Sequence, residues 1–101
     1  MSYVSDAAAL IRENLPADAR PPEGSDSLFL LYALLLRSKG EQVTAADVHD
    51  AWATWMELQN PLHAAIVPFD ELSAATQDMD LPYVRAIHAA AAIQAKHEES
   101  K

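Results

Sequence analysis

The chain has 101 residues, half of them hydrophobic, which is enough for one domain with a modest core and too little for two. Fifteen acidic residues against seven lysines and arginines give a formal net charge of −8, which disfavours DNA, RNA and anionic membranes as partners. The absence of cysteine excludes disulfides, thiolate metal sites and thiol catalysis, and is typical of a protein of the reducing cytoplasm.

The first half of the chain contains two predicted helices separated by a loop. Apolar residues recur at helical spacing up to Leu15, which predicts a helix near residues 3–14 that the following proline ends. The next segment, PADARPPEGSD, holds three prolines and a glycine, which disfavour both helix and strand pairing. A second helix, SLFLLYALLLRSK, follows, with Asp26 or Ser27 as its N-cap and Gly40 at its end.

The second predicted helix is apolar on every side from Leu28 to Leu36. A helix of this kind is expected to run through the centre of the fold, and the alternative is that another copy of the chain covers part of it. The run is nine residues long, against roughly 18 for a membrane span, and the first residues lack the features of a signal peptide. We therefore expect a cytoplasmic protein with no membrane partner.

The second half of the chain predicts a helix with two tryptophans, a short helix and a final long helix. Thr44 and Asp47 form a near capping box for a helix that runs to about Leu58. A short helix is predicted around residues 70–77, and Asp80 is expected to cap the last helix. The faces expected to be buried are Val48, Ala51, Trp52, Trp55 and Met56 on the first of these helices, and Val84, Ile87, His88, Ala91 and Ala95 on the last.

These elements predict a mainly α fold, a compact single-domain bundle of four to five helices with a short extended segment near residues 63–68. The domain is expected to span residues 1–96, followed by a charged tail, residues 97–101, that frays. The segment HAAIVPFDEL, residues 63–72, is predicted to fix the third helix against the last, with Pro68 stiffening its turn.

Two short motifs lie in this half of the chain. The first is HDAWA at residues 49–53, and the second is HAAIVPFDEL followed eight residues later by Asp80. Together they resemble the ryanodine-receptor repeat (RyR) domain, whose patterns are His-x-x-Trp-Ala and His-x-x-Leu-x-Pro-Tyr-x-x-Leu with a later Asp. The resemblance covers about residues 45–90. Phe69 replaces the family's tyrosine, Gln77 replaces its lysine, and a longer stretch with Gly-Trp and basic residues is missing.

The resemblance implies a compact, helical, non-enzymatic domain of the single-copy prokaryotic or phage type, which senses or regulates and has adenine-nucleotide-type ligands. The matching positions are fold determinants or site residues, and the resemblance leaves this choice open. They are His49, Trp52, His63, Pro68, Phe69 and Asp80.

Trp52 and Trp55 lie three residues apart on the predicted third helix. They either stack on a flat ligand such as a purine or fill the core. We favour the core for both, with Trp55 as the more exposed of the two.

Histidines and arginines supply the other candidate binding groups. The four histidines lack the spacing of a zinc site, so no metal is expected, and His49 or His63 is predicted to donate a hydrogen bond to the Pro68 loop. Four arginines could bind a phosphate or carboxylate, namely Arg12, Arg20, Arg37 and Arg85. Arg85 beside Tyr83 is our choice, and surface ion pairing is the alternative.

No arrangement of nucleophile, base and orienting group is recognisable, so we expect neither an enzyme nor a cofactor. The favoured function is a non-enzymatic small-ligand-binding module that senses or sequesters an adenine-nucleotide-derived signal molecule. The alternative is a homodimeric helical module for protein interaction, which uses the apolar surplus of the second helix. The predicted ligand-binding residues are Trp52, Trp55, Tyr83, Arg85, His49 and His63.

Overall fold

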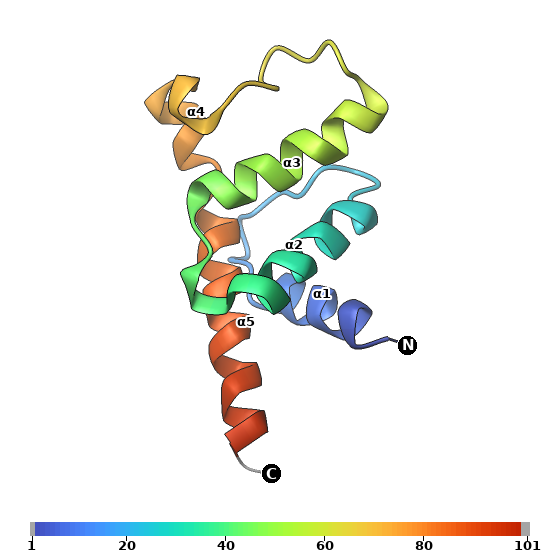
Figure 1. The fold of residues 1–101 in the computed structure, drawn as a ribbon, viewed down its shortest axis with the longest axis vertical. Coiled ribbons are helices and arrows are strands. Elements are labelled where there is room, and N and C mark those ends of the chain that lie inside the picture. Colours follow the sequence, from blue (N-terminus) through green and yellow to red (C-terminus); the bar gives the residue numbers. More distant parts are fainter. Residues whose placement is uncertain (1, 100–101) are drawn as a thin grey trace.

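A computed structural model describes residues 2–99, and all regular structure within them is helical (Figure 1). This confirms the mainly α prediction. The helices are α1 (Tyr3–Glu13), α2 (Asp26–Lys39), α3 (Ala45–Gln59), α4 (Ala74–Asp78) and α5 (Leu81–Glu99), with 3-10 turns η1 (Gly40–Gln42) and η2 (Phe69–Glu71). The predicted tail is helical up to Glu99, while Ser100 and Lys101 lie outside the described residues.

The capping box of α3 is present as predicted. The Thr44 hydroxyl accepts a hydrogen bond from the Asp47 amide at 3.2 Å, and the Asp47 carboxylate accepts one from the Thr44 amide at 2.9 Å. Two of the unpaired amides at the helix start are thereby satisfied. Lys39 extends the arrangement with an ion pair to Asp47 at 2.9 Å.

The start of α2 differs from the prediction, because Ser25 and not Asp26 or Ser27 occupies the N-cap position. Asp26 lies in the first turn, where its charge suits the helix dipole, and it pairs with Arg12 of α1 at 2.8 Å. Gly40 ends α2 with a positive φ of 56°, a conformation that favours glycine.

The core forms where α2 packs against α1, α3 and α5. Its largest fully buried side chains are Tyr32, Phe29, Ile11, Leu28, Ile87 and Val48. The prediction that α2 is enclosed on every side is wrong, since Leu30 and Leu34, one turn apart, are 43% and 60% exposed. No neighbouring helix of the described chain covers that stripe of α2.

Residues 60–73 join α3 to α4 and cross the top of the molecule in Figure 1. The extended segment expected near residues 63–68 is absent, because successive turns fold the chain. The His63 amide donates to the Asn60 carbonyl at 3.0 Å, and the Ile66 amide donates to the His63 carbonyl at 3.1 Å. In place of one short helix at residues 70–77, the chain forms η2 and then α4, which Ser73 caps.

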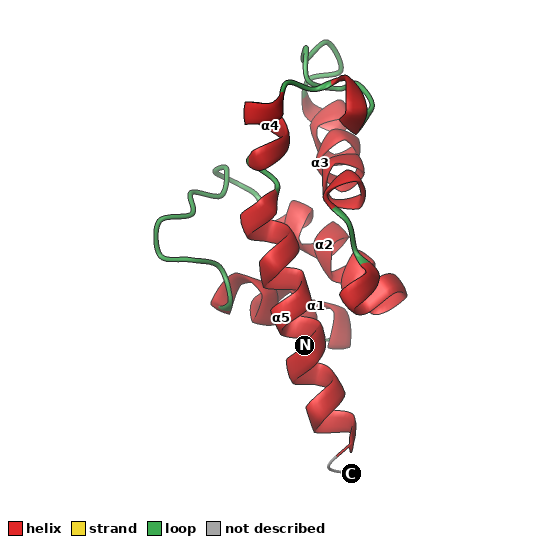
Figure 2. Ribbon diagram, turned by 90° about the vertical axis from the view of Figure 1, so that its left-hand side faces the viewer, coloured by secondary structure: helices red, strands yellow, loops and turns green. Residues whose placement is uncertain are grey.

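Helix α5 is the longest element and packs against α1, α2 and α3 in turn, with its last turns projecting beyond the other helices (Figure 2). On its inner side Val84 and Ile87 are buried as predicted, together with Ala86 and Ala90, whereas Ala95 is exposed. Among the helices described, none combines the length and the apolar character needed to cross a bilayer.

Candidate functional site

A cavity of about 430 Å³ lies where α2, α3 and the start of α5 meet the loop between α1 and α2. Side chains of α4 and of the segment between α3 and α4 complete its wall. The volume falls within the range of small-molecule sites, roughly 300–1,000 Å³. Because protein interiors are otherwise closely packed, a cavity of this size is a candidate ligand-binding site.

Five of the twelve residues that line the cavity carry an aromatic ring. Tyr32 of α2 and Tyr83 of α5 lie with their ring centroids 5.5 Å apart and their planes tilted by 41°. On α3, the Trp52 ring stacks on the His49 ring, with the centroids 5.6 Å apart and 22° between the planes. The edge-to-face contact of Trp52 with His63, at 5.2 Å, continues the wall into the segment after α3. Four separate segments therefore bring five ring systems to one place.

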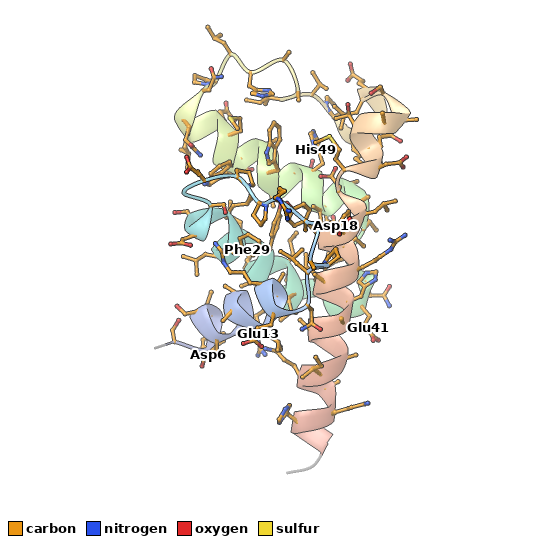
Figure 3. The ribbon with its side chains drawn as sticks, turned by 180° about the vertical axis from the view of Figure 1, so that it is seen from behind. Asp6, Glu13, Asp18, Phe29, Glu41 and His49 are labelled. Atoms are coloured by element: carbon orange, nitrogen blue, oxygen red, sulfur yellow. The ribbon has the colours of Figure 1, made fainter. Side chains whose placement is uncertain are left out.

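His49 anchors the segment between α3 and α4. The residue is 3% exposed. Its Nε2 lies 2.7 Å from the Val67 carbonyl oxygen, and because that oxygen only accepts, Nε2–H is the donor. Figure 3 shows His49 on the side of α3 that faces this segment. The predicted hydrogen bond from a histidine to the Pro68 loop is confirmed, and Phe69 adds a tilted ring contact to His49 at 6.3 Å.

His63 is half-buried, and its ring is oriented by its own backbone neighbourhood. The Ala65 amide donates to His63 Nδ1 at 3.1 Å, so the proton of the neutral ring resides on Nε2. The ring lines the cavity next to Trp52.

Asp80 contributes a carboxylate to the cavity at the start of α5. Its backbone carbonyl accepts hydrogen bonds from the Tyr83 and Val84 amides, both at 3.1 Å. The carboxylate itself receives no hydrogen bond from any residue of the described part of the chain, which corrects the expectation that this side chain caps the helix. Pro82 has no amide to offer, and the Tyr83 amide is already bonded to the carbonyl.

The electrostatics of the cavity reflect this unpartnered acid. Burial raises the pKa of Asp80 to about 6, and the charge of His49 opposes the increase only in part. Burial also raises the pKa of the Tyr32 and Tyr83 phenols, and the nearby Asp80 carboxylate adds to the effect on both. Both phenols therefore remain neutral at physiological pH.

Arg20 is the arginine at this cavity. It extends from the loop between α1 and α2 and donates to the carbonyls of Ala17 and Ala19 at 3.1 and 3.2 Å. Its guanidinium is exposed and forms no ion pair with residues 2–99, Asp80 included. Arg85, our choice from the sequence, is exposed on α5 and does not line the cavity.

Of the predicted ligand-binding residues, the structure brings His49, Trp52, His63 and Tyr83 together and leaves Trp55 and Arg85 apart. The expected order of the two tryptophans is reversed. Trp55 is 5% exposed and packs in the core, because it shares the inner face of α3 with Val48. Trp52 lies on the flank of that face and is only half-buried, so its ring reaches the cavity.

Sequence reasoning missed Tyr32 and the role of Asp80, and it preferred Arg85 to Arg20. Two signals were visible in the sequence. Tyr32 is the only residue with a polar tip in the apolar run of α2, and Pro82 removes an amide that Asp80 would otherwise cap.

The chain was compared with protein families, curated proteins and solved structures. Residues 2–92 match the family described as Domain of unknown function (DUF7701). No curated protein and no solved structure matches the chain. Since the match extends over nearly the whole chain, the protein belongs to the DUF7701 family.

Proposed function

We propose that the chain is a non-enzymatic, cytoplasmic ligand-binding module that takes up a planar small molecule in the aromatic cavity. The observation that carries this proposal is the convergence of five aromatic ring systems on one cavity of about 430 Å³. A ring buried only for stability would be packed against other side chains, as Trp55 is. Trp52 and Tyr83 are only partly buried against the core, and both also line the cavity.

An adenine-nucleotide-derived molecule, which the RyR resemblance also implies, fits the chemistry of this wall. A base stacked on an aromatic side chain gains roughly 1–3 kcal/mol, and Trp52 offers the largest ring. Arg20 at the cavity is suited to a phosphate, and its charge acts locally against the overall charge of −8. Because that overall charge opposes anions, we expect monophosphates to bind better than triphosphates.

Binding is a better proposal than catalysis because of how the polar groups are used. The aliphatic hydroxyl of Thr76, a residue that lines the cavity, is hydrogen-bonded to the Ser73 hydroxyl at 2.9 Å and not to a base. His49 Nε2 is occupied by the Val67 carbonyl. A nucleophile needs a base within hydrogen-bond reach, and these contacts do not supply one.

The proposal is tested by thermal denaturation with a panel of linear, cyclic and ADP-ribose-type adenine nucleotides. A ligand that binds only the folded chain raises the Tm in a concentration-dependent way. Trp52→Ala and Arg20→Ala should weaken the effect, whereas Arg85→Ala, outside the cavity, should leave it unchanged. Absence of any shift at millimolar concentration would reject nucleotide binding.

A second candidate function is a homodimeric or partner-binding helical module. The observation that favours it is the exposed pair Leu30 and Leu34 on α2. Light scattering should then give a dimer mass that Leu34→Glu converts to a monomer without loss of helicity. A monomeric wild-type chain would exclude self-association. Both functions are compatible, because α2 presents Leu30 and Leu34 to solvent and Tyr32 to the cavity.

A further inference from the structure

Polar atoms at the cavity wall have hydrogen-bonding capacity that the protein does not use. The Asp80 carboxylate and the hydroxyls of Tyr32 and Tyr83 have no hydrogen-bond partner among residues 2–99. The Tyr32 side chain is almost entirely buried, at 2% exposure, yet none of its polar atoms is sealed away from solvent-accessible space. Its hydroxyl therefore keeps some accessible surface, and Tyr32 and Asp80 both line the cavity.

Polar side chains inside a protein are nearly always hydrogen-bonded to other protein groups, whereas these three depend on solvent or a ligand for partners. Helix capping does not explain Asp80, since Pro82 lacks the amide and the Tyr83 amide bonds elsewhere. Neutralisation by Arg20 does not explain it either, because no ion pair joins Arg20 and Asp80 among residues 2–99. The Asp80 carboxylate therefore lies at an aromatic cavity and neither caps α5 nor forms an ion pair within the described residues.

We propose that Asp80 determines the specificity of this cavity, by accepting a hydrogen bond from an amino or ammonium N–H of the ligand. The inference rests on the proposed ligand-binding function and names the group that the ligand must carry. An ionised carboxylate only accepts hydrogen bonds, so it favours a donor and repels a carbonyl oxygen. Tyr32 and Tyr83 also line the cavity, and the face of an aromatic ring attracts the same positive charge.

Among purines, this selection distinguishes the amino from the keto form. Adenine presents an exocyclic amine, whereas hypoxanthine presents a carbonyl oxygen at the same position. A site built around one hydrogen bond rejects an analogue that lacks it, strongly where the site is fully enclosed. For the half-buried Asp80 we expect a preference on the order of tenfold to 100-fold.

The test is calorimetric titration of the full chain with two matched pairs of probes. Adenosine 5′-monophosphate and inosine 5′-monophosphate differ in amine against carbonyl on one scaffold. Benzylamine and benzyl alcohol differ in ammonium against hydroxyl on one ring. We expect the nitrogen-bearing member of at least one pair to bind at least about tenfold more tightly.

Asp80→Asn keeps the size of the side chain and adds a donor, so the preference should fall to about twofold or less. Asp78→Asn is the matched control, since Asp78 is an exposed acid of α4 two residues away and does not line the cavity. The preference should survive in Asp78→Asn. Circular dichroism checks the fold, and the comparison of probe pairs on the wild-type chain needs no variant.

The outcomes separate the two proposals. Equal binding of both members of each pair would overturn the role of Asp80 while leaving a ligand-binding cavity. Absence of binding by all four probes at millimolar concentration, together with no shift from the nucleotide panel, would overturn the ligand-binding function itself. Preference within the benzylamine pair alone would support Asp80 and replace the nucleotide with an organic cation.

Discussion

Two aspartates at helix starts have opposite environments in this protein. At α3, Asp47 accepts a hydrogen bond from the Thr44 amide and pairs with Lys39. Burial alone would raise the pKa of Asp47, but the hydrogen bonds from Thr44 and Lys39 outweigh it and lower the pKa. At α5, Asp80 has no such partners, and its pKa is raised to about 6. The same residue type stabilises one helix start and leaves the other with an open acceptor.

The largest change in the free energy of unfolding is expected from removing the capping interactions at the start of α3. Asp47→Ala removes the acceptor of the Thr44 amide and the partner of Lys39, so the free energy of unfolding should fall by about 1–2 kcal/mol. Urea denaturation measures it. Asp50→Ala, an exposed acid of the same helix, is the control and should stay within about 0.5 kcal/mol of the wild type. A similar loss in both variants would contradict the capping role.

Removing the charge of Asp80 at the start of α5 should raise the free energy of unfolding instead of lowering it. Asp80→Asn should stabilise the ligand-free chain at pH 7 by about 1 kcal/mol, a value reduced for the solvent screening of a half-buried group. That corresponds to a rise in Tm of about 4–8 °C for a domain of this size. A lower Tm would show that the carboxylate supports the fold.

The advantage of Asp80→Asn should depend on pH. The folded pKa of Asp80, about 6, lies above the usual value of 3.8, so the folded chain binds more protons between these values. Its contribution to stability therefore falls as the pH rises through this window. Denaturation of both proteins from pH 4 to 7 should give a Tm difference near zero at pH 4 that widens to pH 7.

The smallest effect is expected at the ion pair of Asp47. Lys39→Met should cost only about 0.2–1 kcal/mol, because the Lys39 side chain is half-exposed and the Thr44 hydrogen bonds remain. The loss should shrink in 1 M salt, which screens exposed charges. Urea denaturation at low and high salt checks both statements. A salt-independent loss would place the effect in packing of the lysine stem.

Local features of the fold were predictable from the sequence, and the site was predictable only in part. The Thr44–Asp47 capping box and the Gly40 end of α2 depend on residues a few positions apart, so short patterns suffice. The choice between Trp52 and Trp55 depends on the rotation of α3 about its axis.

The cation at the cavity was not predictable from local patterns. Arg20 lies at the cavity because of the path that the proline-rich loop between α1 and α2 takes. The packing of α5 places Arg85 on the exposed side of that helix. Both outcomes depend on contacts between segments far apart in the chain. The RyR resemblance stays a prediction. Of its six matching residues, Pro68 and Phe69 do not line the cavity, whereas the other four do: His49, Trp52, His63 and Asp80.

Pro82 sets up a competition between folding and recognition for one carboxylate. An amide at this position would give Asp80 an internal donor and make it an ordinary helix cap. In Pro82→Ala, the new amide at position 82 would donate a hydrogen bond to the Asp80 carboxylate. The ligand-free protein would then gain stability, and the cavity would no longer distinguish an amine from a carbonyl. Pro82 thus leaves the Asp80 carboxylate free to bind a ligand, and α5 lacks one capping hydrogen bond as a result.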